Sequence, residues 1–257
     1  MLTKIDFAKI PDVFFIGDVH IQFSQVVNDL RTRKKIRDAL VICCGDIGCG
    51  FYKIGYYVDL FRRLNERLKR ENITLAFVRG NHDNPDFFNE TELVSKRLTE
   101  FSNIKFIPDY SILMTNVGNI LCVGGAISID RTNRVEDKSY WYNESVIPLN
   151  DELREQLSSE TIDIVVTHSA PTVAPPEQKY LGGWCVGDIN LVSDVLNERN
   201  TLQELYEYLK AHNEIKHWVY GHFHAHYDAI IDGTRFHCCD MFRDGKGKPG
   251  TDIYYIH

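Results

Sequence analysis

The chain has 257 residues, 44% of them hydrophobic and 25% charged, a composition typical of an ordinary soluble globular protein. Lysine and arginine number 29 against 36 aspartate and glutamate residues, so the net charge of −7 argues against sequence-independent binding to nucleic-acid phosphates. The N-terminus lacks the layout of a signal peptide, and no apolar run approaches the length of a membrane span. We therefore expect a cytoplasmic protein with no membrane partner; the sequence leaves the oligomeric state open.

Apolar runs alternate with helical periodicity through the first hundred residues. The runs VFFI (13–16), LVICC (40–44) and TLAFV (74–78) have the composition of buried strands. Apolar side chains recur at helical spacing after the first two runs, at Val26, Val27 and Leu30 and at Tyr57, Leu60, Phe61, Leu64 and Leu68. This βαβαβ order with wholly apolar strands predicts a parallel sheet that is buried on both faces.

The second half of the chain predicts two hairpins and two more buried strands. Residues 112–128 predict a hairpin that turns around 116–119, and the tail predicts another at Asp232 and Gly233. The runs IDIVVTH (162–168) and HWVYGH (217–222) predict strands, separated by a segment whose helical part covers roughly residues 188–212. No linker or repeat interrupts the pattern, so we predict a single domain over residues 1–257.

Polar side chains follow five of the predicted strands directly. In chain order they are Asp18 and His20, then Asp46, then Asn81, His82 and Asp83, then His168, and finally His222 and His224. Parallel strands deliver their carboxyl ends to one edge of a sheet, where ligands collect. We therefore expect these side chains to surround one spot.

The residue types in this set suit a metal site. Carboxylate oxygens, imidazole nitrogens and one amide oxygen fit Mn, Fe, Zn or Ni better than Ca. Two ions held about 3.5–4 Å apart need a bridging carboxylate, and Asp46, the lone carboxylate after its strand, is the natural bridge. An extended backbone would point His222 and His224 to the same side, where they would serve neighbouring ions.

The chain resembles the calcineurin-like metallophosphoesterases. The resemblance rests on five motifs in the family's order: GDVH (17–20), GD (45–46), GNHD (80–83), TH (167–168) and GHFH (221–224). It implies an α/β fold, a four-layer αββα sandwich of two mixed β-sheets flanked by helices. It also implies that Asp18, His20, Asp46 and His224 hold one divalent ion and that Asp46, Asn81, His168 and His222 hold the other.

The same resemblance implies a chemistry. Two divalent transition-metal ions would hold a bridging hydroxide that attacks the phosphorus of a small phosphate mono- or diester, with His82 and Asp83 as the catalytic pair. Asp83 would orient the His82 imidazole and keep it protonated. Two alternatives stay open: a nuclease or cyclic-nucleotide phosphodiesterase, and a scaffold protein of the same fold without catalysis. Nucleic acid is expected only as the substrate of the first.

Differences between the motifs of this chain and those of known subgroups narrow its place within the family. Ile21 and the stretch GDIGCGF differ from the Ser/Thr protein phosphatases and remove the arginine with which they grip phosphate. The stretches GGAISIDRTNR and YWYNE (124–144) resemble a bacterial and phage subgroup of unassigned substrate. There, Arg131 and Arg134 are candidates to clamp the substrate phosphate, unless they pair with Asp130 or Glu136.

Several of these residues also have structural interpretations. Asp18 and Asp46 have the residue type of helix N-caps, His82 that of a turn residue, and His168 that of a satisfied core histidine. His226 extends the histidine alternation and would either touch the metal site or face solvent. The aromatic residues near the arginines would form a wall for a nucleobase or pack on the sheet: Tyr140, Trp141, Tyr142 and Trp184.

Overall fold

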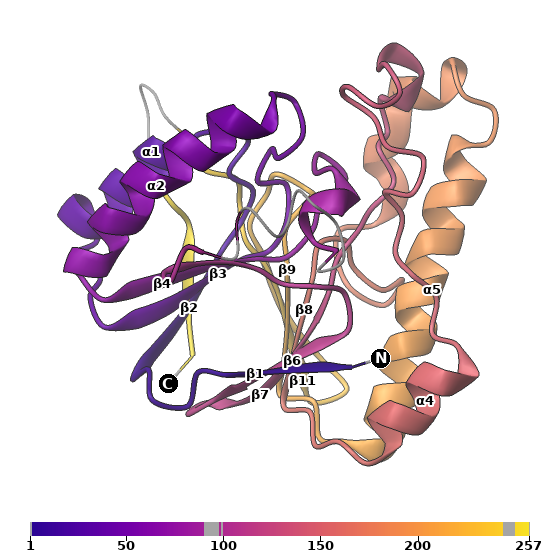
Figure 1. Cartoon of the computed structure of the whole chain (residues 1–257). Helices are drawn as coiled ribbons and strands as arrows, with labels where there is room; N and C mark the ends of the chain where they lie inside the picture. Colours follow the sequence, from indigo (N-terminus) through magenta and orange to yellow (C-terminus); the bar gives the residue numbers. More distant parts are fainter. Residues whose placement is uncertain (1, 90–97, 99, 244–249, 257) are drawn as a thin grey trace.

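The computed structural model describes residues 2–89, 98, 100–243 and 250–256 (Figure 1). Its smaller sheet has five strands in the order β12-β2-β3-β4-β5. The strands are β2 (Asp12–Ile16), β3 (Ala39–Cys43), β4 (Ile73–Phe77), β5 (Ile104–Phe106) and β12 (Ile253–Tyr255). The first four are parallel and β12 is antiparallel to β2. Every residue of β3 and β4 is buried, as their apolar composition predicts.

The larger sheet has seven strands in the order β1-β6-β7-β8-β9-β11-β10. They are β1 (Thr3–Asp6), β6 (Ser111–Thr115), β7 (Gly118–Val123), β8 (Ile164–Thr167), β9 (His217–Tyr220), β10 (Tyr227–Ile231) and β11 (Thr234–Cys238). The pairs β6–β7 and β10–β11 are the two predicted hairpins, and the remaining pairs are parallel. Asp232 and Gly233 both have positive φ, at 48° and 79°, as a tight two-residue hairpin turn requires.

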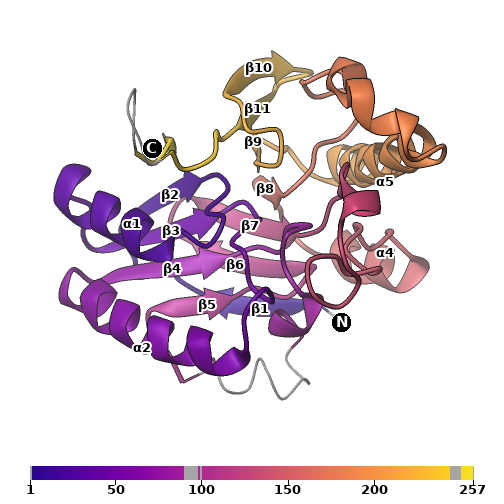
Figure 2. The same ribbon diagram turned by 90° about the horizontal axis from the view of Figure 1, so that it is seen from above.

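Helices cover the outer faces of both sheets. The helices are α1 (Phe23–Asn28), continued by the π-helical turn η1 (Asp29–Arg33), α2 (Ile54–Arg70), α4 (Asp151–Ser158) and α5 (Leu191–His212). Short 3₁₀ segments are η2 (Pro85–Phe87), η3 (Arg131–Asn133) and η4 (Gln178–Val186). Figure 2 shows α1 and α2 on one side of the two sheets and α4 and α5 on the other. None of the helices within the described ranges is long and apolar enough to span a membrane.

Three hydrophobic clusters define the layers. One joins α1 and α2 to the five-stranded sheet, and another joins α4 and α5 to the seven-stranded sheet. The third lies between the sheets, where Phe15 and Ile42 meet Ile120 and Val166. The alternation of side chains along a strand explains the division, because Ile42 faces the other sheet while Val41 and Cys43 face the helices. The predicted four-layer α/β sandwich of two mixed sheets is confirmed.

Candidate metal centre

The loops after the strands approach one another so closely that two positions admit only glycine. A Cβ at Gly45 would lie 2.2 Å from Nδ1 of His168, and a Cβ at Gly80 would lie 2.2 Å from the backbone nitrogen of Asp46. Gly45 also has a φ of 100°, which side chains disfavour. These glycines let the ends of β3, β4 and β8 converge on one point.

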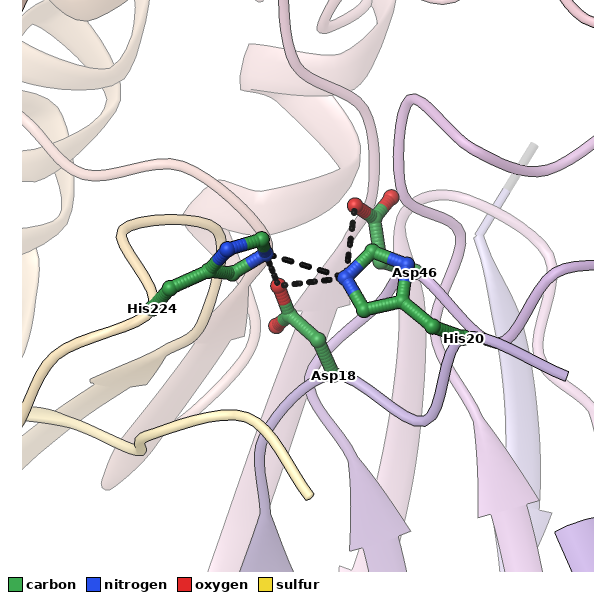
Figure 3. Close-up of side chains that lie close together, drawn as sticks. All are labelled: Asp18, His20, Asp46 and His224. Carbon is green, nitrogen blue, oxygen red and sulfur yellow. Dashed lines mark hydrogen bonds and ion pairs between the residues drawn. The ribbon is translucent and has the colours of Figure 1, made fainter. Parts of the chain in front are cut away.

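Four of the predicted ligands form a compact cluster, drawn in Figure 3: Asp18, His20, Asp46 and His224. The Nε2 atoms of His20 and His224 lie 2.9 Å apart. Oδ2 of Asp18 is 3.0 Å from Nε2 of His224 and 3.7 Å from Nε2 of His20. Oδ2 of Asp46 is 4.0 Å from Nε2 of His20. One ligand atom from each residue therefore falls within 4.8 Å of the others.

This cluster fits one divalent transition-metal ion. The two imidazole nitrogens face each other, and Oδ2 of Asp18 is buried without a hydrogen bond of good geometry, although Nε2 of His224 is 3.0 Å away. Ligand atoms around a tetrahedral ion with bonds of about 2.1 Å lie roughly 3.4 Å apart. The observed spacings of 2.9–4.0 Å bracket that value. The donor set is the mixed N/O set that such ions prefer.

The remaining three predicted ligands lie on the other side of Asp46. Nε2 of His168 is 3.1 Å from Oδ1 of Asp46 and 3.1 Å from Oδ1 of Asn81. The ring centroids of His168 and His222 are 5.0 Å apart. Asp46 thus turns Oδ2 toward the first cluster and Oδ1 toward the second, an arrangement that would suit a carboxylate shared by two ions.

The electrostatics of the second cluster are those of a buried ion pair. Burial alone would raise the pKa of Asp46, but the charge of His168 holds that pKa well below its usual value. Burial alone would lower the pKa of His168, yet Asp46 raises it to about 10. Burial and the neighbouring His168 lower the pKa of His222 to about 3. A histidine must be deprotonated to bind a metal. His222, with its lowered pKa, already has a free nitrogen, whereas His168 must release a proton when a metal ion binds.

Two buried residues that the sequence did not single out orient Asn81. Nδ2 of Asn81 donates to Oγ of Ser128 at 3.0 Å, which turns Oδ1 toward His168. The hydroxyl and the backbone N–H of Ser128 each donate to the carboxylate of Glu144 at 2.6 Å. Burial raises the pKa of Glu144 to about 8. Such support behind a ligand fixes its orientation. Ser128 and Glu144 lie 47 and 63 residues from Asn81 in the chain, so no local pattern indicates them.

Asp83 does not lie on the His82 ring, so the prediction that it orients this imidazole is wrong. Both oxygens of its buried carboxylate accept backbone N–H groups at 2.8–3.2 Å, from Ile47, Gly48, Cys49 and Gly80. Burial and the charge of Asp46 raise the pKa of Asp83 to about 6. The carboxylate ties the loop after β3 to the loop after β4, and thereby positions the ligands on both.

The backbone around His222 and His224 is not extended, contrary to expectation. β9 ends at Tyr220, and the two histidines have φ values of 68° and 50°. Oδ1 of Asp18 accepts the backbone N–H of His222 at 3.0 Å, which holds this turn against the loop after β2. The turn, rather than strand alternation, sends His224 to one cluster and His222 to the other.

The ring of His82 faces Arg134 and not Asp83. Nη2 of Arg134 lies 2.5 Å from Nε2 of His82, and Nη1 lies 3.3 Å from Nδ1. The carboxylate of Asp130 accepts from Nε and Nη2 of the same guanidinium at 2.6 and 2.8 Å. A guanidinium can only donate, so the closer contact assigns Nε2 of a neutral His82 ring as the acceptor; Nδ1 then carries the ring N–H, and its 3.3 Å contact with Nη1 is not a hydrogen bond. Burial lowers the pKa of His82. The charge of Arg134 lowers it further, and the charge of Asp46 opposes both effects.

Arg131 has other partners than those expected. It donates to Asp188 at 2.5 and 3.1 Å and to Asp194 at 2.6 Å, and it does not line the pocket beside the metal cluster. These bonds tie η3 to Asp188, just before α5, and to Asp194 in the first turn of α5. Its predicted role as a phosphate clamp is therefore not supported, and neither is its pairing with Asp130 or Glu136. Arg134 does pair with Asp130 and keeps one edge on the pocket.

A pocket of about 320 Å³ lies beside the candidate ligands and is lined in part by Asp46, His222 and His224. Its walls combine Asp130 and Arg134 with the apolar side chains of Ile129, Trp184 and Phe223. Of the aromatic residues considered for a nucleobase wall, Trp184 is the one that lines this pocket. The others lie elsewhere: Trp141 is buried beside Phe51, and Tyr142 is exposed.

Comparisons with known proteins agree with this architecture. The crystal structure of TT1561 from Thermus thermophilus is similar over 90% of both chains, with 10% identity and a TM-score of 0.54, which shows a shared fold. The phosphopantetheinyl hydrolase of Mycobacterium tuberculosis is similar over 91% of both chains, with 16% identity and a TM-score of 0.49. A dimetal phosphatase from Danio rerio is similar over 91% of this chain and 88% of its own, with 11% identity and a TM-score of 0.48.

The last two likenesses are weak, so the shared fold rests on the first. No curated protein sequence matches the chain. A family model described as calcineurin-like phosphoesterase matches residues 11–226, which include all five motifs. The chain belongs to the calcineurin-like phosphoesterase family.

Proposed function

We propose that the chain hydrolyses small phosphate mono- or diesters at a centre of two divalent transition-metal ions. One observation carries the proposal: Asp46 stands between two ligand clusters and turns a different oxygen to each. Asp18, His20 and His224 would complete one position, and Asn81, His168 and His222 the other. Metal ions in such a pair activate water and neutralise the charge on the phosphoryl oxygens.

Arg134 and His82 are the groups of the chain that would handle the substrate. The guanidinium of Arg134 reaches the pocket and is suited to bind phosphate oxygens. Anionic phosphate would draw this guanidinium away from the His82 ring and remove a cation that keeps the ring neutral. The His82 ring would then take up a proton from solvent and give it to the leaving oxygen, which returns the ring to its neutral form. Asp130 would hold Arg134 in reach of both partners.

The pocket supports a small substrate with an apolar or aromatic leaving group. Its volume of about 320 Å³ is at the lower end of the range of ligand sites. Trp184, Phe223 and Ile129 offer contact to such a group, while Arg134 and His82 offer contact to the ester.

One observation favours the diesterase alternative. Among the described side chains that line the pocket, Arg134 is the single arginine or lysine, and Asp130 already neutralises much of its charge. A phosphodiester carries one negative charge, whereas a monoester carries up to two at neutral pH. A pocket with one shared cation beyond the two ions suits the singly charged ester. The scaffold alternative is disfavoured because the ligand set is complete and His82 faces the pocket.

A substrate panel tests the proposal. The protein is freed of metal with a chelator, supplied with Mn²⁺, and assayed on 4-nitrophenyl phosphate, bis(4-nitrophenyl) phosphate and a set of nucleotides. We expect no turnover in chelator and recovery with Mn²⁺ on at least one ester, with the diester preferred if the charge argument holds. Turnover that is equal with and without chelator, in protein that contains no metal, would contradict the proposal.

A further inference from the structure

A second cluster of metal-binding residue types lies outside the catalytic centre. His226 precedes β10, His237 is in β11, and Asp252 immediately precedes β12. Each offers one ligand atom, and the three atoms lie within 4.8 Å of one another, the same limit that encloses the four ligands of Figure 3. Nδ1 of His226 is 3.1 Å from Oδ2 of Asp252, and the rings of His226 and His237 have centroids 5.0 Å apart.

His237 is buried and held in one orientation. Its side chain is 95% buried, and its ring stacks on Tyr254 at a centroid distance of 3.9 Å, so it cannot turn away. Nδ1 lies 3.1 Å from a carboxylate oxygen of Asp228, which can only accept, and therefore carries the proton. In the neutral ring Nε2 then presents a lone pair, and it makes no hydrogen bond of good geometry among the described residues, although the Cys239 thiol lies nearby.

The surroundings of His237 are those of a histidine that binds a metal. A ligating histidine usually donates its other ring N–H to a carboxylate, as His237 does to Asp228. The exposed His226, 57% accessible, and the partly exposed Asp252 leave a route from solvent to the cluster.

We propose that His226, His237 and Asp252 bind one divalent transition-metal ion, of the class of Zn²⁺, separate from the catalytic pair. Two imidazoles and one carboxylate, with a remaining position open to water, are a common ligand set for such ions. The ion joins two parts of the fold that share no strand pairing here, the β10–β11 hairpin of the seven-stranded sheet and the start of β12 in the five-stranded sheet. It also fixes the end of the turn that carries His224.

A plain ion pair between His226 and Asp252 explains less. An exposed pair of this kind contributes little to stability, and it leaves the buried Nε2 of His237 without a hydrogen bond of good geometry. A single bound metal ion accounts both for the His226–Asp252 contact and for the orientation of His237. The inference does not depend on the proposed phosphoesterase chemistry, because none of the three residues lines the catalytic pocket.

Metal counting with matched variants tests the inference. The full chain is stripped of metal, equilibrated with Zn²⁺ and analysed for bound metal, alongside His226→Ala and Asp252→Asn. His212→Ala serves as the control, because His212 is an exposed histidine at the far end of α5. His237→Ala is avoided, since loss of a buried, stacked ring would disturb the fold. We expect one Zn²⁺ fewer per chain, or at least about tenfold weaker binding of that ion, in the two site variants only.

The Asp46→Asn background separates this ion from the catalytic ones. We expect the additional Zn²⁺ to persist in Asp46→Asn and to be lost when His226→Ala is added. Circular dichroism verifies that each variant is folded. If Asp252→Asn does not fold, His226→Ala alone still tests the inference. Equal Zn²⁺ content and affinity in wild type, His226→Ala and His212→Ala would overturn the inference. Loss of the additional ion with Asp46→Asn alone would overturn it as well.

Discussion

The two sheets contribute different residue types to the candidate metal centre. The loops of the five-stranded sheet supply both carboxylates, the amide and two imidazoles: Asp18, Asp46, Asn81, His20 and His82. The loops of the seven-stranded sheet supply imidazoles alone: His168, His222 and His224. The five-stranded sheet thus supplies the negative charge, and the seven-stranded sheet supplies imidazoles only.

The two sides also differ in what holds them. Within the five-stranded sheet, the Asp46 carbonyl accepts the N–H groups of Val19 and His20, and Asp83 joins the loops after β3 and β4. The histidines of the other sheet depend on contacts across the interface. Nδ1 of His168 lies 2.6 Å from the carbonyl oxygen of Cys44, and the N–H of His222 bonds to Asp18. The loops of the five-stranded sheet bond to one another, whereas the histidines of the seven-stranded sheet are held by bonds across the interface in addition to the bond from the Gly221 N–H to the His168 carbonyl.

The largest effect is expected from Asp46, on the charged side. Asp46→Asn keeps the shape of the side chain but replaces one ligand oxygen with an NH₂ group that cannot bind a metal. We predict loss of at least one catalytic ion and of nearly all activity, with the fold retained. Metal analysis and turnover on both nitrophenyl esters measure this. Normal turnover with an unchanged metal content would show that the charged side does not hold the ions as described.

His82 should give the next largest effect, and one that depends on the substrate. General acid catalysis contributes about 10² to 10⁴ in rate, but only where the leaving alkoxide is poor. We predict that His82→Ala slows an alkyl phosphate by roughly that factor and an aryl phosphate with an acidic phenol far less. Metal content should stay unchanged.

Asp83→Asn provides the contrast to His82→Ala. Since Asp83 bonds to the backbone of the ligand loops, its substitution should lower thermal stability and affect both substrates alike. Selective loss of alkyl-phosphate hydrolysis in Asp83→Asn would restore the catalytic role that the structure removes. Equal losses on both substrates in His82→Ala would remove the acid role from His82.

On the imidazole side, Glu198 of α5 predicts a pH dependence of stability. Burial raises its pKa from 4.5 to about 7 in the folded protein, so the folded state binds the proton more tightly than the unfolded state. Its contribution to the free energy of unfolding therefore falls as pH rises from about 4.5 to 7. Between pH 4.5 and pH 8 the wild type should lose roughly 3 kcal/mol relative to Glu198→Gln.

Urea unfolding of the metal-free proteins at several pH values measures this difference. The fixed cost of the substitution itself cancels, because only the change of the difference with pH is compared. A gap between wild type and Glu198→Gln that is the same at every pH would mean that the carboxyl is not protonated on folding.

The smallest effect concerns the support behind Asn81. Ser128→Ala removes the acceptor that fixes the Asn81 amide, and loss of such support typically costs about 10- to 100-fold in metal affinity. We predict a loss in that range for one of the two ions, measured by competition with a chelator, while the fold is kept. Ser193→Ala, at an exposed serine of α5, is the control. Equal metal affinities in Ser128→Ala and Ser193→Ala would show that Ser128 does not support Asn81.

The sequence predicts the strand ends of this fold well because the signal there is local. A wholly apolar strand that ends in glycine and a polar residue marks one edge of the sheet, as at Gly45 and Asp46. The short strands β1 and β5 lack such runs and were not predicted. The turn at His222 was missed because its φ values depend on a bond to Asp18, about 200 residues away in the chain.

The tasks of the site residues are harder to predict than their presence. Residue type shows that Asp83 can accept hydrogen bonds, but which donors reach it depends on how the loops after β3 and β4 fold together. The same holds for Arg131, whose partners Asp188 and Asp194 follow about 60 residues later. Glu144 has no spacing relation to Asn81 at all. Long-range contacts decide these roles, and a local pattern does not record them.

The most direct test of the account is the activity of metal-free protein as Mn²⁺ is returned to it. His226→Ala, which lacks the additional site that we infer, is the suitable form for this titration. We predict that two Mn²⁺ bind per chain and that hydrolysis of the preferred ester rises with the second. Activity that is complete before any metal binds, or that reaches its maximum with a single ion, would contradict the two-ion centre built around Asp46.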